Sequence, residues 1–318
     1  MNDFIFLEYD IKYSQETIDL WNEEIGFIYP ISPKMFNQNI NNKYLFKEGS
    51  FVVFNKNKLV GFILTKIYDN NMIISKYINN SWISLFYVSS EFRCQGIGSA
   101  LLKKFEEEVR KTDVTKISVG SDIDCFFPGI PNDFDNLTDI FFSKRGYNVS
   151  YYTHDLVNHL NKYKILHQHT DKYIYRYAKK SDKDKVLEFF KECFYGRWYY
   201  EALEYFDDND IKEEYLIVLD KDKVIGFLRT NKNLISKISY NVMWSSRFEK
   251  LIGLGPLGVN SQYRKQGIAS NLIKIALKEA KMNNYSEALI DWTGLVAFYQ
   301  KYGFETWKCY QYANKNIK

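Results

Sequence analysis

Hydrophobic and polar positions along the chain follow an order that occurs twice. Runs in which every second residue is apolar are typical of strands, whereas apolar residues three and four apart are typical of helices. In each half the pattern predicts a strand, a helix, a hairpin, a strand, a long helix, a strand, a helix and a last strand. The expected ranges are 3–9, 14–25, 51–54 with 60–67, 82–88, 97–111 and 115–120, and again 172–178, 182–194, 215–219 with 224–230, 256–260, 267–283 and 286–291.

Three sequence blocks recur in the same order, as a duplicated chain requires. Any one similarity could arise by chance, but three in one order indicate a duplication. The chain near residues 157–170 has weak periodicity. We therefore expect an N-terminal domain of residues 1–158, a linker of residues 159–170 and a C-terminal domain of residues 171–318. The paired blocks are Leu59–Thr65 with Val224–Thr230, Glu91–Ser99 with Gln262–Ser270, and Phe141–Tyr147 with Phe298–Phe304.

The charge balance and the cysteines exclude several classes of protein. The net charge is +4 over 318 residues, and no run of Lys or Arg resembles the basic stretch of a nucleic-acid-binding protein. The four cysteines lie far apart without a CxxC pair, which favours a reducing compartment over a disulfide framework or a zinc site. No stretch approaches the roughly 18 consecutive apolar residues of a spanning helix, and the N-terminus is unlike a signal peptide. We expect a cytoplasmic protein with no nucleic-acid or membrane partner.

The histidines gather near the expected linker. They are His154, His159, His167 and His169. Because no known ligand spacing joins them, we prefer the polarity of a linker to a metal site as their interpretation, and we expect no metal.

A glycine-containing turn lies in each half between an expected strand and an expected helix. The two turns, Arg93–Gly98 and Arg264–Ala269, share the form R-x-x-G-x-G/A. The first amides of a helix have no intrahelical acceptor and the helix dipole adds positive charge there, so such a turn can hold a phosphate. Glycine lets the backbone approach that phosphate closely. A helix with a glycine near its start is the plainer interpretation of a single turn, but recurrence at equivalent places favours an anion cradle.

The two turns resemble the pyrophosphate signature of the GNAT superfamily of acyl-CoA N-acyltransferases, Q/R-x-x-G-x-G/A. Residues 297–304 resemble that superfamily's closing helix-to-strand segment. The loop Phe126–Pro131 is similar to one in acetyltransferase-like domains found alongside some glycosidases. The resemblance covers essentially the whole chain as a tandem pair. It implies an α/β (α+β) fold of two GNAT-like domains, each a mixed, mostly antiparallel sheet with helices on both faces, and acetyl-CoA as cosubstrate.

The resemblance assigns cofactor contacts to both turns and to the strands before them. In the family the second-half strand separates from its neighbour, binds the pantetheine arm and polarises the thioester carbonyl. Here it contains Gly255 and Pro256, which inside a strand mark a bulge or a close approach. The first half has a plain β run, so its turn either binds CoA or keeps only the fold. The expected contacts are Leu257, Gly258, Val259, Arg264, Lys265, Gln266, Gly267, Ile268, Ala269 and Ser270, with Val88, Arg93, Gln95, Gly96, Ile97, Gly98 and Ser99 in the first half.

Two residues are candidates for proton transfer. Tyr299 falls on the position of the tyrosine that protonates the departing CoA thiolate in the family, and Phe142 stands at the equivalent place in the first half. A phenol stays protonated at neutral pH, as this role requires. Asp291 is the candidate general base. Two plainer interpretations stay open, Tyr299 as a buried aromatic and Asp291 as the N-cap of the next helix. Trp292 stands where relatives often have an asparagine that touches the cofactor.

The acceptor is the least defined part. In the family the region between the first two helices covers the acceptor site, and here Trp198 and Tyr199 are either substrate contacts or core residues. We expect an N-acetyltransferase whose catalytic domain is the second half and whose first half is non-catalytic. It moves an acetyl (acyl) group from acetyl-CoA to an amine of a small molecule or peptide by direct attack. We expect a monomer whose halves pack as a dimer would. The alternatives are a non-catalytic acyl-CoA-binding or sensing protein, an aminoacyl-tRNA-dependent transferase, and transfer to a hydroxyl.

Overall fold

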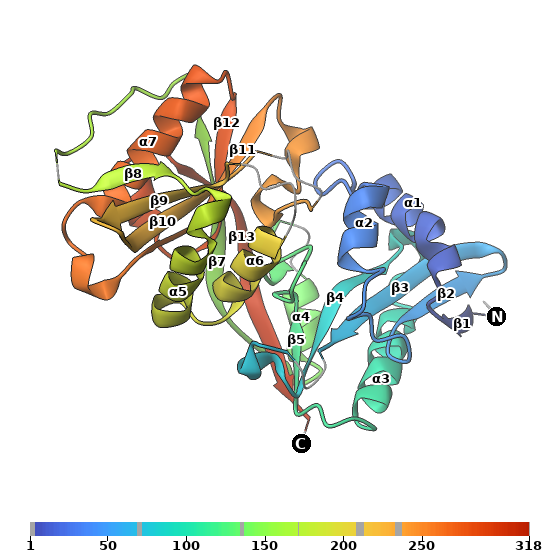
Figure 1. Cartoon of the computed structure of the whole chain (residues 1–318). Helices are drawn as coiled ribbons and strands as arrows, with labels where there is room; N and C mark the ends of the chain where they lie inside the picture. The colour runs from blue at the N-terminus through green and yellow to red at the C-terminus, as the bar shows by residue number, and fades with distance from the viewer. Residues whose placement is uncertain are drawn as a thin grey trace. The chain divides into compact units, whose positions relative to one another are not determined.

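The chain forms two compact units. The structure is a computed structural model that describes residues 4–68, 72–133, 137–170, 172–207, 213–232 and 237–317 (Figure 1). Unit 1 contains Met1–Thr153 and Cys309–Lys318, and unit 2 contains His154–Lys308. The predicted α/β fold, with mixed sheets and helices on both faces, is confirmed.

Unit 1 is built on a sheet in the order β1-β2-β3-β4-β5-β13. Its described strand pairs are antiparallel apart from β4–β5, which is parallel. Helix α3 packs on the face that carries Val60 and Ile63, while Trp21 of α1 contacts Phe62 on the other face. The elements are β1 (Phe4–Glu8), α1 (Ser14–Ile25), α2 (Pro33–Asn39), β2 (Phe51–Asn55), β3 (Lys58–Ile67), β4 (Asn80–Val88), α3 (Ile97–Val109), β5 (Lys116–Val119), β6 (Ile130–Pro131), α4 (Thr138–Ser143) and the ends of β7 (Asn148–His159) and β13 (Glu305–Asn316) that fall in this unit.

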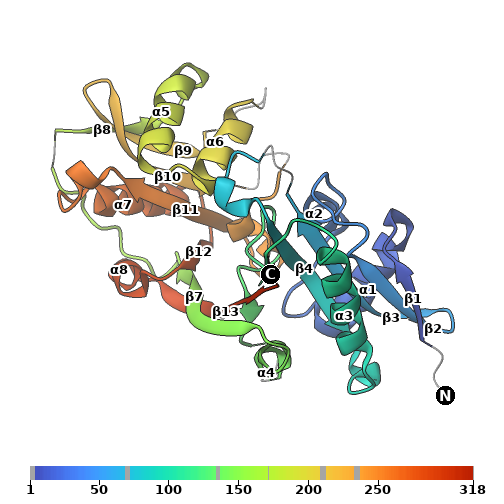
Figure 2. The same cartoon turned by 90° about the horizontal axis from the view of Figure 1, so that it is seen from below.

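Unit 2 repeats this plan with a sheet in the order β7-β12-β11-β10-β9-β8. Figure 2 shows α5 and α6 on one side of β9 and β10 and α7 on the other. Alternate residues of β9 account for this, because Leu216 and Val218 pack under α7 whereas Ile217 and Leu219 pack under α5 and α6. The elements are β8 (Ile174–Tyr177), α5 (Lys183–Cys193), α6 (Arg197–Asp207), β9 (Tyr215–Asp220), β10 (Lys223–Asn231), β11 (Leu251–Val259), α7 (Ile268–Met282), β12 (Glu287–Thr293) and α8 (Val296–Gln300).

Each unit takes its closing strand from the other half of the sequence. β7 pairs with β12 of unit 2 through residues 154–159, and β13 pairs with β5 of unit 1 through residues 313–316. The expectation that each half is closed by its own last strand is therefore wrong. Strand pairing needs only matched backbone groups, and two halves with the same plan offer them equally, so the sequence does not tell which sheet a closing strand joins.

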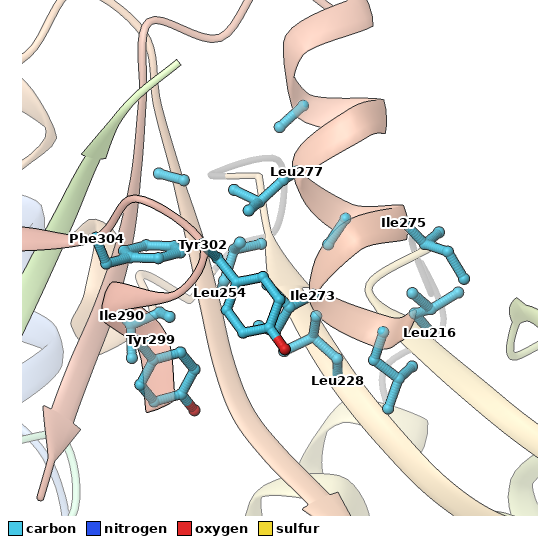
Figure 3. Packing of buried hydrophobic residues seen from close by; sticks show 14 of the residues in the cluster. Leu216, Leu228, Leu254, Ile273, Ile275, Leu277, Ile290, Tyr299, Tyr302 and Phe304 are labelled. Carbon is cyan, nitrogen blue, oxygen red and sulfur yellow. The ribbon is translucent and has the colours of Figure 1, made fainter. Parts of the chain in front are cut away.

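The core beneath α7 surrounds the closing helix of unit 2. Figure 3 shows Tyr299, Tyr302 and Phe304 packed beside Ile290 of β12, with the Tyr299 hydroxyl directed away from Ile290 and Phe304. Tyr299 is 6% exposed. The expected buried aromatic is therefore present, but its polar end lies at the edge of the cluster.

Candidate functional site

The two glycine turns have the same backbone shape. Cys94 and Gly96 precede α3 with φ of 61° and 85°, and Lys265 and Gly267 precede α7 with φ of 63° and 82°. These left-handed residues curl the chain so that successive amides converge, which is the shape of an anion-binding nest. A side chain is strained at such φ values, so glycine suits the cap position.

The arginine of each turn ties it to the strand before it. Arg93 Nε donates a hydrogen bond to the carbonyl of Val88 at 3.2 Å, and Arg264 Nε donates to the carbonyl of Val259 at 3.2 Å. The equal distances show that the R-x-x-G-x-G/A pattern encodes one loop geometry twice. The arginine therefore holds the loop on its strand whether or not it also meets a ligand.

The amides at the start of α7 are available to a ligand. Within the part of unit 2 that the structure describes, nothing accepts a hydrogen bond from the amides of Ile268, Ala269 or Ser270, and the Gly267 cap supplies no side chain. The first helical bond runs from Asn271 N to Gly267 O at 2.9 Å. Unsatisfied amides at a helix N-terminus fit the diphosphate of an acyl-CoA.

The surroundings of the two turns differ. At Gly96 no heavy atom lies within 4 Å of the place where a Cβ would stand, whereas at Gly267 the Cδ2 atom of His169 lies 3.5 Å from that place. In unit 1 the Ser99 hydroxyl oxygen accepts a hydrogen bond from Arg145 at 2.6 Å, so an arginine lies beside the start of α3. The turn of unit 1 is thus the more open, and that of unit 2 has an imidazole beside it.

β11 separates from β12 just before the glycine turn. The parallel pairing of these strands is confined to Leu251–Gly253, so β11 has no strand partner on that side from Leu254 to Val259 among the described residues. The register with β10 also slips by one residue near Gly255. The predicted contacts Leu257 and Gly258 lie on this unpaired stretch, where free backbone groups can bind an extended ligand.

The corresponding strand of unit 1 is not the plain β run that we expected. β4 pairs with β5 only through Asn80–Ile83, and its register with β3 slips by one residue at Ser84. That prediction is wrong because a single extra residue in a strand does not disturb an apolar run enough to be seen in sequence. In both units, therefore, the strand before the glycine turn separates from its parallel neighbour and shifts its register with its antiparallel one.

Asp291 lies where β11 and β12 separate. Asn241 Nδ2 donates to Asp291 Oδ1 at 3.1 Å, and a Cβ on Gly255 would lie 3.2 Å from the same oxygen. Neighbouring atoms enclose the carboxyl group although part of the residue stays accessible, and this loss of hydration raises the pKa of Asp291 to about 6 while Arg197 opposes the rise. A carboxyl group poised near neutrality suits a general base.

Asp291 is not a helix cap. The N-cap of α8 is Leu295, and its amide donates to Thr293 Oγ1 at 3.0 Å. The turn between β12 and α8 is fixed from another strand, because the amide of Trp292 donates to the fully buried carboxylate of Asp155 at 2.9 Å. The carboxyl group of Asp291 is thereby left for a role other than closing this turn.

Tyr299 is near enough to Asp291 for the charge of that carboxylate to act on its phenol. Burial, with a further contribution from the negative charge of Asp291, raises the pKa of Tyr299 above its usual value of 10. Its hydroxyl makes no hydrogen bond within the described residues, although the ring packs edge-on against Phe298 and Phe304. A buried phenol with an uncommitted proton beside a carboxyl group has the composition of an acid and base pair.

The equivalents of these two groups in unit 1 carry no ionisable side chain. The parallel strand registers show that Gly120 stands at the position in unit 1 that corresponds to Asp291 in unit 2. Phe142 corresponds to Tyr299. A cavity of about 90 Å³ occupies the separation of β4 and β5, with Ile83, Phe86 and Phe142 in its lining. Unit 1 therefore has space for an apolar group but no proton donor or acceptor at the two positions.

The polar groups of unit 1 nearest this cavity are committed to a buried ion pair. Ser84, which lines the cavity, donates to Asp122 Oδ2 at 2.7 Å. The same oxygen pairs with Lys66 Nζ at 2.6 Å, and both charged side chains are 0% exposed. A charge pair held this deeply is costly to separate, so Asp122 does not replace the missing carboxyl group.

Comparison with known proteins supplies the family. The sequence profile of the acetyltransferase (GNAT) family matches residues 15–124 and 183–304, one region in each half. The chain belongs to this family. The tandem arrangement predicted from the repeated blocks is confirmed, and the family assignment supports acetyltransferase activity in general. No match was found among curated proteins.

Solved GNAT structures share the fold of the whole chain. A fungal multi-domain GH3 β-N-acetylglucosaminidase with a GCN5-related glucosamine N-acetyltransferase region has a TM-score of 0.85 and 23% identity over 99% of this chain, which spans 38% of that protein. A GCN5-related N-acetyltransferase from Sphaerobacter thermophilus has a TM-score of 0.69 and 14% identity, covering 99% of this chain and 96% of that one. A tandem GNAT protein from the clavulanic acid biosynthesis pathway gives 0.69 and 14%, covering 99% and 98%. At these identities the likeness shows the fold alone.

Sequence reasoning missed the amides that position Asp291 in this GNAT unit. Asn231 Nδ2 donates to Asn241 Oδ1 at 2.8 Å, and Ser239 Oγ donates to Asn231 Oδ1 at 2.8 Å. A Cβ on Gly253 would lie 2.0 Å from Asn241 Oδ1, so glycine there admits the amide. The chain is rich in asparagine, and nothing in the spacing of these residues marks them, which explains why they were not predicted.

The predicted acceptor contacts lie on α6. Trp198 packs against the apolar cluster beneath α5 and α6, with its ring 5.0 Å from that of Phe194. Tyr199 stacks on the exposed ring of Tyr195 at 5.5 Å. Their role in acceptor binding stays a prediction, and Tyr199 has the more accessible surroundings.

Replacing Asn241 with Ala tests the positioning of Asp291. Losing the donated hydrogen bond removes one contact that favours the carboxylate, so the pKa of Asp291 should rise further. We expect the low-pH limb of kcat/KM to move to higher pH and kcat to fall about 5–20-fold. A pH profile of kcat/KM measures this. An unchanged profile in a variant that unfolds at the wild-type temperature would contradict the role.

The described ranges contain no group of three or more His, Cys, Asp or Glu side chains that could hold a metal ion. They also contain no helix that is long and apolar enough to cross a membrane.

Proposed function

We propose that this GNAT chain transfers an acetyl group from acetyl-CoA to an amine in unit 2 by direct attack. The observation that carries the proposal is the convergence of three features of that unit: free amides at the start of α7, the separation of β11 from β12, and Asp291 beside Tyr299. Unit 1 has the same backbone with Gly120 and Phe142 in place of the two ionisable residues. The contrast supports chemistry in unit 2 and, at most, ligand binding in unit 1.

The residues of unit 2 have separate tasks in holding acetyl-CoA, which supplies the activated thioester. The turn Arg264–Ser270 offers amides and positive charge to the diphosphate. Leu257–Val259 offers unpaired backbone groups to the pantetheine arm, and an amide there can stabilise the charge that develops on the thioester oxygen. The contacts Lys265, Gln266 and Ile268 follow from their places in the same turn.

The proton transfers follow from the two pKa values. The Asp291 carboxylate takes one proton from the acceptor ammonium, directly or through one water, and the free amine then attacks as the nitrogen–carbon bond forms and the carbon–sulfur bond breaks. Tyr299 gives its proton to the departing sulfur. The proton on Asp291 then returns to the phenolate, which is the stronger base because the pKa of Tyr299 exceeds that of Asp291. The second proton that the nitrogen loses on becoming an amide is released to solvent, and much of the rate comes from holding the reactants together.

The acceptor that we favour is a small amine, including amino sugars. The region of the fungal protein that shares this fold is named a glucosamine N-acetyltransferase region, which makes glucosamine the first amine to test. The surroundings of Asp291 fit an ammonium acceptor, since a carboxylate attracts the cation before it removes the proton.

Calorimetric titration with acetyl-CoA, followed by a panel of amines, tests the proposal. We expect at least one equivalent bound and acetylation of one or more amines, with release of free thiol as the measured product. Binding without turnover on a panel of amino sugars, polyamines and peptides would instead favour the alternative of a non-catalytic acyl-CoA-binding or sensing protein. Absence of acetyl-CoA binding would contradict both.

A further inference from the structure

A segment of unit 2 runs along α7 to the glycine turn. Residues 164–170, which we call the strap, follow Tyr163, whose carbonyl accepts a hydrogen bond from Lys281 Nζ at 2.6 Å in the last turn of α7. Six residues after Tyr163 the strap reaches His169 beside Gly267, at the first turn of the same helix. The strap therefore spans the helix from its end to its beginning.

The far end of the strap is fixed by one buried side chain. Asn271 Oδ1 accepts from the amide of His169 at 2.8 Å, and Asn271 Nδ2 donates to the carbonyl of His169 at 2.9 Å. Asn271 is 1% exposed, so its amide group is held with little freedom. The equivalent residue of unit 1 is Ala100, which cannot make such a clamp.

The clamp holds only the backbone of His169, so its imidazole takes no part in the clamp. The ring lies against Gly267, with Cδ2 3.5 Å from the place of a Cβ, and its nitrogens make no hydrogen bond within the described residues. Tyr173 Oη donates to Gln266 Oε1 at 2.6 Å, so a second residue from beyond the strap also contacts this turn. Residue 169 itself is exposed.

We propose that His169 is a phosphate-binding residue of unit 2, placed by Asn271 to donate a hydrogen bond from its imidazole to the diphosphate of the acyl-CoA. The inference rests on the proposed function. An imidazole N–H within reach of a diphosphate adds a donor to those of Ile268–Ser270, and the basic residues Arg264 and Lys265 of the turn favour an anion there. Because the clamp fixes the backbone before binding, little conformational entropy is lost when the contact forms.

The test measures binding to unit 2 alone. A Gly96→Asp background places a carboxylate in the open turn of unit 1, where it repels a diphosphate. In this background, His169→Ala should weaken acetyl-CoA and dephospho-CoA about 5–10-fold each by calorimetry, since both contain the diphosphate. His167→Ala, which removes a second exposed histidine of the strap, is the matched control and should leave both affinities unchanged.

Kinetics and a double variant separate a positioning role from a structural one. With native unit 1, His169→Ala should raise KM for acetyl-CoA and leave kcat unchanged, because the contact is the same before and during reaction. Asn271→Ala should weaken binding as His169→Ala does, and the double variant should be no weaker than either. Additive losses would mean that Asn271 acts on the fold and not through His169.

Three results would overturn the inference while leaving the proposed function intact. These are unchanged affinity in His169→Ala, tighter binding, which would mean that the strap obstructs the turn, and a loss confined to acetyl-CoA, which would place the imidazole at the 3′-phosphate. Failure of the proposed function would differ from all three, because the parent protein would then acetylate no amine, whether or not it binds acetyl-CoA.

Discussion

Replacing Tyr299 with Phe is expected to lower kcat about 10²–10³-fold while the affinity for acetyl-CoA stays within about twofold. The substitution keeps the ring and its contacts with Phe298 and Phe304 and removes only the hydroxyl. Since that hydroxyl has no hydrogen-bond partner in the described residues, its loss leaves no protein group unsatisfied. Stopped-flow or steady-state measurement of thiol release, with calorimetry for binding, separates the two effects.

The reason for a large effect is the state of the departing sulfur. Without a donor, a thiolate forms in surroundings that hydrate charge poorly, and those surroundings raise the barrier to its departure. The raised pKa of Tyr299 keeps the phenol protonated across the working range, so the effect of the substitution should be independent of pH between about 6 and 9.

Unit 1 provides the matched control. Phe142→Tyr introduces the hydroxyl at the equivalent position, where Gly120 offers no carboxyl group, and should not change turnover. Equal loss of turnover and of acetyl-CoA affinity in Tyr299→Phe would mean that the hydroxyl shapes the binding site. Retention of full activity would show that the sulfur leaves with its proton supplied by solvent.

The repeated pattern predicted most of the fold because it is local. α1 occupies residues 14–25 as predicted, and α3 and α7 begin within one residue of their expected starts. The turns were found from the recurring R-x-x-G-x-G/A pattern, whose first glycine takes a left-handed cap position that suits few other residues. Amphipathic periodicity and helix caps depend on residues that are close in sequence, so both can be predicted from a single sequence.

Other parts of the fold depend on partners distant in the chain. β11 begins five residues before its predicted start. Gly253 and Gly255 interrupt the strand pattern because Asn241 packs against the first and Asp291 against the second, which leaves little room for a side chain. α2 was missed although Ser32 caps it and Pro33 opens it, a local signal that a closer analysis could have used. The exchange of the closing strands left no local signal.

The candidate site likewise combines residues that the sequence predicted with residues that it did not. Tyr299 and the second turn came from the resemblance and both fall in unit 2, whereas the Asn231–Asn241 network depends on residues that approach only in three dimensions. The predicted difference between a bulged and a plain strand did not hold, and the difference between the units proved to be Asp291 against Gly120 and Tyr299 against Phe142. The proposed difference between the two units therefore rests on residue type at matched positions and not on strand regularity.

Asp291→Asn should lower kcat/KM about 10²-fold and abolish the low-pH limb of its profile. In the parent protein the raised pKa places that limb near pH 6, with activity rising as the carboxyl group loses its proton. An amide of the same shape can accept no proton, so the residual activity should not change between pH 5 and 7. Measurement of kcat/KM with an amine that the parent protein acetylates gives both results.

The same substitution should stabilise the protein, which distinguishes a base from a structural carboxylate. A carboxyl group whose pKa is raised on folding, from about 3.9 to about 6, binds a proton more tightly in the folded state, so it costs stability as pH rises through this window and by a constant amount above it. Asp291→Asn should therefore raise the free energy of unfolding by about 1–3 kcal/mol at pH 8 and have little effect at pH 4. Asp155→Asn is the contrasting control, because that buried carboxylate accepts from Trp292 N and Tyr240 Oη and its loss should destabilise unit 2. If Asp291→Asn instead lowers stability as Asp155→Asn does, its effect on turnover follows from the fold, and the base must be sought in another residue.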